Sequence, residues 1–433
     1  MKIFILFFSG ILFFTLFYSC SPLEELTPEL SAQDVLNQAY LEEISEDQPP
    51  TAAKIIKTNP KKVYVHYMPW FDSKEIDSYW GQHWTMTNQN PDIIDEQGKR
   101  QIATHYYPLI GPYSSYDNDL QEYHLLLMKI AGIDGVIFDW YGSRDLHDYD
   151  KLKVNTESFI KEIEEVGLEF AIMYEDKVTE YKSMSKSIAD YQLAARADMN
   201  YIKNTYFTSK NYLRVNGQEM LFIFGPHYIT NPQDWNFIFQ DFGLNPKIMT
   251  LWGASDRVGP FAYGEFSWVD KNHLGTLSYY YDQVSAKGIP LVGSSYPGFN
   301  DFYYEGGWRS TEEFDWIIPH NETATLAETL SLTHDWSSEF IQIITWNDFG
   351  EGTMVEPTLE FGYSLLREIQ EYTGAPFTED DLHLPYRLYQ LRKLHKNDNR
   401  LQNVLNQVYK SIFTLNFSKA DGLMSTIEKE YGT

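Results

Sequence analysis

Residues 119–140, DLQEYHLLLMKIAGIDGVIFDW, contain the repeating unit from which the fold can be predicted. The first part has the apolar spacing of an amphipathic helix, and Gly132 stands where such a helix would be capped. The run DGVIFDW (134–140) follows, and it is apolar on both faces, as expected of a parallel strand covered by helices. A helix followed by a doubly buried strand is the unit of an α/β fold.

Seven further apolar runs of this kind occur along the chain. They are VYVHY (63–67), EFAIMYE (169–175), MLFIFG (220–225), KIMTLW (247–252), FSWV (266–269), PLVGSSY (290–296) and IQIITW (341–346). Helix-like segments such as NTESFIKEIEEVG (155–167) lie between most of them, although the interval 247–269 leaves little room for a helix. Eight strands that alternate with helices predict an α/β fold of the (β/α)₈ TIM-barrel type.

The segments outside this repeat predict the domain organisation. Residues 1–20 combine a positive start, a short apolar run and a final Cys20, which predicts a signal peptide with a lipobox-like cysteine. An ordinary secretory signal is the alternative. Residues 21–60 are polar, acidic and punctuated by proline, and we interpret them as a linker or tether with one short helix. We expect the catalytic barrel at 61–372 and a helical appendage, without strand signals, at 373–433.

Cysteine and histidine usage restricts the chemistry of the folded body. Cys20 is the only cysteine, which excludes disulfide frameworks, cysteine-ligated zinc and iron–sulfur clusters. The 11 histidines show no H-E-x-x-H spacing, and the motifs of nucleotide, dinucleotide and serine-hydrolase sites are absent from the sequence. We therefore expect no metal and no cofactor.

Lipidation of Cys20 predicts an exported outer-membrane or cell-surface lipoprotein, with a periplasmic location as the alternative.

The overall charge and the aromatic content indicate a class of partner. Lys and Arg number 34 and Asp and Glu number 61, so the net charge is −27. A field of this sign repels phosphate backbones and anionic lipids, which argues against nucleic acid as a ligand. Aromatic residues make up 16% of the chain, a surplus that suits stacking on sugar rings. We expect a neutral poly- or oligosaccharide partner, membrane contact only through the lipid anchor, and a monomer.

The segment ITWNDFGEGTMVEP (344–357) carries the candidate catalytic pair. Asp348 and Glu351 stand three residues apart directly after the last predicted strand, and barrel enzymes place reactive side chains at such strand ends. Gly350 and Gly352 allow close approach of the backbone to a ligand. Glycoside hydrolysis needs one carboxylic acid to protonate the leaving oxygen and a second carboxylate to attack or to activate water. A solvated turn is the structural alternative.

Further residues at strand ends are expected to bind substrate. They are Tyr67, Trp70, His83, Trp84, Asp139, Trp140, Glu175, Lys177, Tyr296 and Asn347. The aromatic members would form a sugar platform and, by lowering the local dielectric, raise the pKa of the carboxyl that must stay protonated. Structural alternatives exist for several of them. Glu175 and Lys177 could form an ion pair, and Asp139 could satisfy backbone groups at the barrel rim. His66, which also ends a strand, could be either a core histidine or a ligand contact.

The segment 344–357 resembles signatures of two carbohydrate-active families. It is similar to the N-E-W-x-E-G-T stretch of glycoside hydrolase family 99, whose members act on α-mannosides in an endo fashion. It also resembles the W-N-D-[YF]-G-E-S stretch of family 71, the α-1,3-glucanases. Other parts of the chain agree with this resemblance, namely YVHYMPWF, WGQHW (80–84), GIDGVIFDWYG (132–142) and YEDK (174–177). The resemblance covers roughly residues 62–370.

The resemblance implies roles for three acids. Glu351 matches the general acid/base, Asp348 the second catalytic carboxylate, and Glu175 an acid near the 2-hydroxyl of the sugar. Asp348 follows the family 71 pattern, whereas Glu351-Gly352-Thr353 follows family 99, so the choice between mannan and glucan stays open.

The leading hypothesis is an α-glycan hydrolase, with α-mannan-type endo-hydrolysis favoured. The alternatives are an α-1,3-glucanase-like activity, a non-catalytic glycan-binding lipoprotein, and another barrel enzyme such as one resembling glycosyltransferases. Carboxyl separations of about 5–5.5 Å would suit a retaining displacement and about 6.5–9.5 Å an inverting attack by water. The resemblance to family 99 implies a third route, in which Asp348 deprotonates the sugar's own 2-hydroxyl to form an anhydro intermediate.

Overall fold

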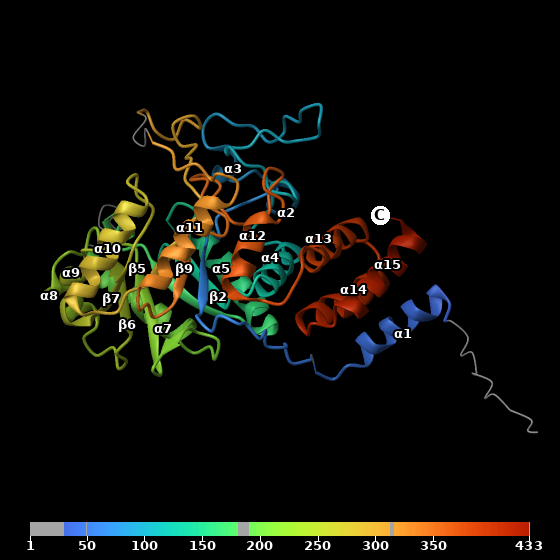
Figure 1. The fold of residues 1–433 in the computed structure, drawn as a ribbon, viewed down its shortest axis with the longest axis horizontal. Coiled ribbons are helices and arrows are strands. Elements are labelled where there is room, and N and C mark those ends of the chain that lie inside the picture. The colour runs from blue at the N-terminus through green and yellow to red at the C-terminus, as the bar shows by residue number, and fades with distance from the viewer. Residues whose placement is uncertain (1–29, 49, 145, 181–189, 312–315, 433) are drawn as a thin grey trace, which may run out of the picture.

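The computed structural model describes residues 30–48, 50–144, 146–180, 190–311 and 316–432 (Figure 1). The predicted signal peptide and Cys20 lie outside these residues. Among the helices that the structure describes, none is both long and apolar enough to cross a bilayer.

Eight parallel strands form the centre of the molecule and confirm the barrel. Their bounds are β1 Val63–Tyr67, β2 Gly135–Trp140, β3 Glu169–Tyr174, β5 Gln218–Ile223, β6 Lys247–Leu251, β7 Ala262–Phe266, β8 Gly293–Ser295 and β9 Ile341–Ile343. The hydrogen-bonded order is β7-β6-β5-β3-β2-β1-β9-β8, and a parallel bridge between Glu265 and Leu291 nearly closes the ring. The short β4 (Arg214–Val215) pairs with β5 in an antiparallel hairpin outside the barrel.

One predicted strand is displaced. The run 266–269 was expected to be the sixth barrel strand, but that strand occupies Ala262–Phe266. The connection from β6 consists only of α9 (Ser255–Val258) and a single 3₁₀ turn, Gly259–Phe261, so β7 begins sooner than the apolar run suggests. Trp268 consequently lies beyond the carboxyl end of β7, among the loops.

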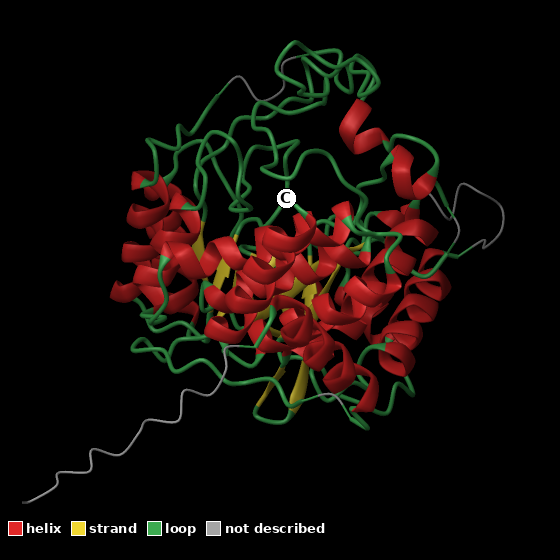
Figure 2. Cartoon of the chain, turned by 90° about the vertical axis from the view of Figure 1, so that its right-hand side faces the viewer, coloured by secondary structure: helices red, strands yellow, loops and turns green. Residues whose placement is uncertain are grey.

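Helices surround the strands on the outside, as Figure 2 shows. The longer ones are α4 Asn118–Ile130, α5 Tyr149–Val166, α7 Tyr191–Thr205, α8 Pro232–Ile238, α10 Leu274–Lys287, α11 Ala324–Leu332 and α12 Ser364–Thr373. Gly132 and Gly167 follow α4 and α5 with φ of +79° and +77°, the left-handed conformation that ends a helix most easily at glycine. Both helix ends agree with the sequence prediction.

The C-terminal segment forms the predicted helices, α13 Glu379–Leu394, α14 Asn399–Phe413 and α15 Phe417–Tyr431. They pack on one side of the barrel through contacts between α13 and α4, where Arg392 Nε lies 2.6 Å from a carboxylate oxygen of Glu122. The short helix expected within 21–60 is α1, Ala32–Ser45, and it lies along α14 (Figure 1). Its Glu43 accepts hydrogen bonds from Gln407 and Lys410, both at 2.8 Å. This part of the predicted tether is therefore packed against the C-terminal helices.

Asp176 holds the loop after β5 in place beside the loop after β3. Its buried carboxylate accepts hydrogen bonds from three successive backbone N–H groups, those of His227 at 2.8 Å, Tyr228 at 2.8 Å and Ile229 at 2.7 Å. Three charge-assisted bonds to one carboxylate fix the course of the loop.

Replacing Asp176 with alanine is expected to lower the free energy of unfolding by about 3 kcal/mol, because buried backbone donors would lose their acceptor. Urea denaturation followed by circular dichroism measures this loss. Asp282→Ala, at an exposed position on α10, is the matched control and should change stability by less than about 0.5 kcal/mol. Equal effects of the two substitutions would contradict this role for Asp176.

Candidate functional site

The loop after β9 brings Asp348 and Glu351 together. The backbone N–H of Asp348 donates to Thr345 Oγ1 at 2.8 Å, and the backbone N–H of Glu351 donates to Asp348 Oδ1 at 2.9 Å. Asp348 is only 2% exposed, and the charge of its carboxyl raises the pKa of Glu351. Neither side chain is the solvated surface acid that the structural alternative required.

Glu351 has the environment of a carboxyl that stays protonated. Its pKa is raised well above the usual range, first by burial and then by the negative charges of Asp348 and Asp301. The positive charge of Arg309 and a hydrogen bond from the Trp268 side chain offset only part of this shift. Within the described part of the chain, its Oε2 atom is buried and has no hydrogen-bond partner. A carboxyl in this position can donate a proton at neutral pH.

Asp348 has a different environment although it lies in the same loop. Burial raises its pKa, but hydrogen bonds from the backbone N–H groups of Glu351 and Gly350 stabilise its ionised form. Asp348 is thus the member of the pair that is better stabilised as an anion. Two neighbouring carboxyls whose environments separate their pKa values are the arrangement from which acid and base roles follow.

Asp139 and Glu175 extend this pair into a row of interacting acids. Asp139, which is 3% exposed, lies near the end of β2, and its pKa is raised by burial and by the charge of Asp348. The pKa of Glu175, directly after β3, is raised well above its usual range by burial and by Asp139. The structure therefore brings together four of the acids expected from the sequence. Lys177 is exposed and offsets only part of the shift at Glu175.

Aromatic rings form a wall beside the candidate catalytic pair. Trp70 stacks on His83 with ring centres 4.1 Å apart, and His83 meets the Trp308 ring edge-on at 5.1 Å. Trp308 lies parallel to Tyr303 at 5.8 Å, and the charges of Asp348 and Glu351 contribute to the raised pKa of the Tyr303 hydroxyl. Trp308 remains 37% exposed, so its ring is available to a ligand. We name Trp70, His83, Tyr303 and Trp308 the aromatic wall.

The aromatic wall joins two distant loops. The backbone N–H groups of Thr87 and Asn88 both donate to the carbonyl of Gly306, at 2.8 and 3.1 Å. Figure 1 shows these loops side by side above the barrel, one in blue and one in orange. Trp70 and His83 were expected from the sequence, and the structure places both in this wall.

Tyr67 and Trp140 do not line the site. Successive side chains of a strand point to opposite faces, so His66 and Asp139 point into the barrel while Tyr67 and Trp140 point toward the helices. The Tyr67 hydroxyl lies 3.1 Å from His124 Nδ1 on α4, and Trp140 stacks on Tyr201 of α7 at 6.0 Å. Both are fully buried. Both side chains therefore face away from the candidate acids, and the structure gives no support to the substrate-binding role expected for these two residues.

Trp84, Tyr296 and Asn347 are buried and make contacts within the protein, and the substrate-binding role expected for them stays a prediction. Trp84 lies on the short helix α3 (Gln82–Thr85), is fully buried, and donates from its indole N–H to the Tyr113 carbonyl at 2.8 Å. Tyr296 is 1% exposed and its hydroxyl contacts His273. Asn347 joins β9 to β1, since it accepts from the Met68 N–H at 2.8 Å and donates to the Met68 carbonyl at 3.0 Å.

His66, for which a core position and a ligand contact were both considered, is a core residue. It is fully buried inside the barrel, and its Nε2 atom lies 2.8 Å from Gln342 Oε1. Burial lowers its pKa to about 4, so the ring is neutral at physiological pH.

Sequence reasoning missed several residues of the site. Trp268 was assigned to a strand, and Asp301, Tyr303, Trp308 and Arg309 were not considered. The stretch DFYYEGGWR (301–309) after the seventh strand combines acids, aromatics and two glycines, as the segment after the eighth strand does. That composition was the available signal. Among the residues that the structure describes, no group of three or more His, Cys, Asp or Glu side chains is arranged to hold a metal ion.

Comparison with known proteins indicates a glycoside hydrolase. The sequence model of glycosyl hydrolase family 99 matches residues 58–246. The chain is a glycoside hydrolase related to family 99. The matched residues include Asp139 and Glu175 but not Asp348 and Glu351, so the roles of the latter pair rest on the structure and on the motif at 344–357.

The curated proteins that resemble this chain are distant relatives. A protein of Danio rerio named glycoprotein endo-alpha-1,2-mannosidase-like protein is 24% identical over 186 residues, which is 40% of this chain and 40% of that protein. The glycoprotein endo-alpha-1,2-mannosidase of Xenopus laevis is 23% identical over 331 residues, which is 69% of this chain and 70% of that protein.

A solved structure shares the fold. The GH99 endo-alpha-mannosidase of Bacteroides thetaiotaomicron superposes with a TM-score of 0.55 at 16% identity, covering 84% of this chain and all of that chain. This likeness concerns the fold, a barrel of the same kind.

Proposed function

We propose that this protein cleaves α-mannosidic bonds inside a glycan chain, with Glu351 as the general acid and Asp348 as its carboxylate partner. The observation that carries the proposal is the division between these two buried acids. Burial raises the pKa of both carboxyls. The pKa of Glu351 lies well above its usual range, whereas two backbone hydrogen bonds limit the rise in the pKa of Asp348, which is about 7. The mannosidase names of the relatives support an α-mannoside as substrate.

In the proposed reaction one side chain donates a proton and the other accepts one. Glu351 donates its proton to the glycosidic oxygen as the bond from this oxygen to the anomeric carbon breaks. Asp348 accepts a proton from the attacking hydroxyl, which belongs either to water or to the sugar itself. Asp139 and Glu175 lie in the same row of acids and would bind sugar hydroxyls, since buried carboxyls need hydrogen-bond partners.

Incubation with yeast α-mannan and, separately, with α-1,3-glucan tests the proposal. New reducing ends are expected from α-mannan, with oligosaccharides as the early products. Hydrolysis of the glucan alone would favour the family 71-like alternative, and saturable binding without hydrolysis would favour a glycan-binding protein. The anomeric configuration of the first product, read by proton NMR, distinguishes retention from inversion.

Trp308→Ala is expected to raise the KM for α-mannan roughly fivefold to tenfold with little change in kcat. The exposed ring of the aromatic wall offers stacking to a sugar outside the reacting centre, and its loss weakens ground and transition states alike. Initial rates across a range of mannan concentrations measure the effect. Tyr279→Ala, which removes an exposed aromatic ring from α10, should leave KM unchanged. A large fall in kcat without a change in KM would contradict the stacking role.

We further propose that the protein acts as a monomer on neutral glycans outside the cytoplasm, tethered by a lipid on Cys20. The support is the sequence of residues 1–20 and the single cysteine. Metabolic labelling with a tagged fatty acid tests the anchor. Label is expected on the wild-type chain and not on Cys20→Ser, and an unlabelled, secreted wild-type chain would contradict the proposal.

A further inference from the structure

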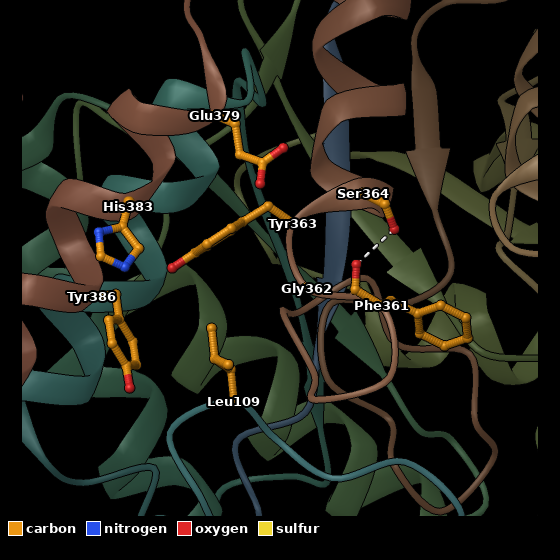
Figure 3. Close-up of a pocket in the computed structure, with 8 residues that line it drawn as sticks. All are labelled: Leu109, Phe361, Gly362, Tyr363, Ser364, Glu379, His383 and Tyr386. Carbon is orange, nitrogen blue, oxygen red and sulfur yellow. Dashed lines mark hydrogen bonds between the residues drawn. The ribbon is translucent and has the colours of Figure 1, made fainter.

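A hollow lies between the start of α12 and helix α13, with a volume of about 490 Å³ (Figure 3). Three distant segments line it. Leu109 comes from the long loop after β1, Phe361 and Tyr363 from the end of the loop after β9, and His383 and Tyr386 from α13. The barrel and the C-terminal helices therefore build it jointly.

Tyr363 gives the hollow an unsatisfied polar group. The residue is only 8% exposed, and within the described chain its hydroxyl is buried without a hydrogen-bond partner. In Figure 3 the Tyr363 side chain extends across the hollow toward His383 and Tyr386. Buried polar groups in native proteins are nearly always hydrogen-bonded, so an unpartnered hydroxyl aimed into a hollow indicates a missing ligand or solvent group.

The remaining lining restricts the chemistry of that ligand. Tyr386 and Leu109 offer apolar surface, and the Glu379 carboxylate at the edge offers hydrogen-bond acceptors. The Ser364 hydroxyl donates to the Phe361 carbonyl at 2.7 Å, a bond that leaves the Ser364 oxygen free to accept another (Figure 3). None of the described residues lining the hollow is Lys or Arg. A neutral ligand that donates several hydroxyl protons and has an apolar face fits this lining, and a sugar ring is such a ligand.

The hollow is connected to the catalytic loop. The Phe361 ring stacks on His320 with centres 4.9 Å apart, and His320 hydrogen-bonds to the backbone at Gly352, next to Glu351. The Tyr106 ring packs against both Phe361 and His320. One layer of rings therefore separates the hollow from the catalytic pair.

We propose that this hollow is a second glycan-binding site, which holds a neutral sugar unit of a polymeric substrate while another part of the chain occupies the catalytic site. This inference rests on the proposed function in one respect only, the choice of mannose as the sugar bound in the hollow. It assigns Tyr363, Tyr386 and Glu379 to binding and gives them no part in bond cleavage.

Calorimetric titration of the full chain with α-linked mannotriose tests the proposal. The double variant Tyr363→Phe with Glu379→Gln removes the unpartnered hydroxyl and the carboxylate charge while keeping the shape of both side chains. We expect two binding sites in the parent protein and one in the double variant. Glu351→Gln serves as the parent here, so that the titrant is not cleaved. The matched control is Tyr409→Phe, which removes a buried tyrosine hydroxyl from α14, outside the hollow.

Kinetics provide a second readout. In the otherwise wild-type enzyme, the double variant is expected to raise the KM for yeast α-mannan roughly fivefold to tenfold and to leave kcat/KM for a short mannooligosaccharide unchanged. An unaltered number of sites together with an unaltered KM would overturn the proposal. Glu379-dependent binding of the polyamine spermidine without sugar binding would also overturn it. Loss of the second site in a protein that cleaves no mannan would refute the proposed function and leave this inference standing.

Discussion

Glu351→Gln is expected to lower kcat on α-mannan by about 10³-fold, a loss typical of removing a general acid. Glutamine keeps the size of the side chain but has no proton to give to the leaving oxygen. The raised pKa of Glu351 arises from burial beside Asp348 and Asp301, so this side chain is the one most able to supply that proton at neutral pH. Initial rates of reducing-end formation measure the loss, and circular dichroism checks that the variant is folded.

The matched control for this substitution is Glu305→Gln. Glu305 is an exposed glutamate in the rim loop after β8. Its backbone carbonyl accepts a hydrogen bond from Asn88, and its carboxylate lies 3.7 Å from His105 Nε2 at the surface. Wild-type rates are expected for this control. If Glu351→Gln retained more than a tenth of the wild-type kcat, Glu351 would not be the general acid.

Asp348→Asn is expected to lower kcat by about 10²- to 10³-fold and also to change the pH dependence of the remaining activity. The general acid must be protonated, so activity falls as the pH rises through the pKa of Glu351. The charge of Asp348 raises that pKa, and its removal must lower it. The alkaline limb of the pH–rate profile should therefore move to lower pH.

The profile of kcat against pH for the wild type and Asp348→Asn tests this sign directly. Asp282→Asn, on the exposed face of α10, should leave both the rate and the profile unaltered. An alkaline limb that stayed in place in Asp348→Asn would show that Glu351 and Asp348 are not coupled. A shift to higher pH would contradict the assigned electrostatics.

The barrel could be predicted from the sequence because its strands are buried on both faces, which leaves continuous apolar runs such as 134–140. The sixth strand was placed too late because the run 266–269 is more apolar than Ala262–Phe266, the segment that forms β7. Hydrogen bonding to β6 determines which residues form β7, and local hydropathy carries no information about such pairing.

The candidate site was only partly predictable for a similar reason. Side chains alternate along β1 and β2, so His66 and Asp139 point into the barrel whereas Tyr67 and Trp140 point to the helices. A prediction based on the composition of the strand ends does not distinguish these two directions. The aromatic wall depends on contact between loops more than 200 residues apart in the sequence, such as Asn88 with Glu305. No local pattern sets the path of such loops, so Tyr303 and Trp308 emerged only from the structure.

The measurement that tests the catalytic assignment most directly is a crystal structure of Glu351→Gln with a bound α-mannooligosaccharide. The expected result is a glycosidic oxygen within hydrogen-bonding distance of the side chain at position 351, with Asp348 facing the anomeric carbon or the hydroxyl that attacks it. A glycan that bound along the rim with every glycosidic oxygen beyond the reach of both side chains would contradict the assignment.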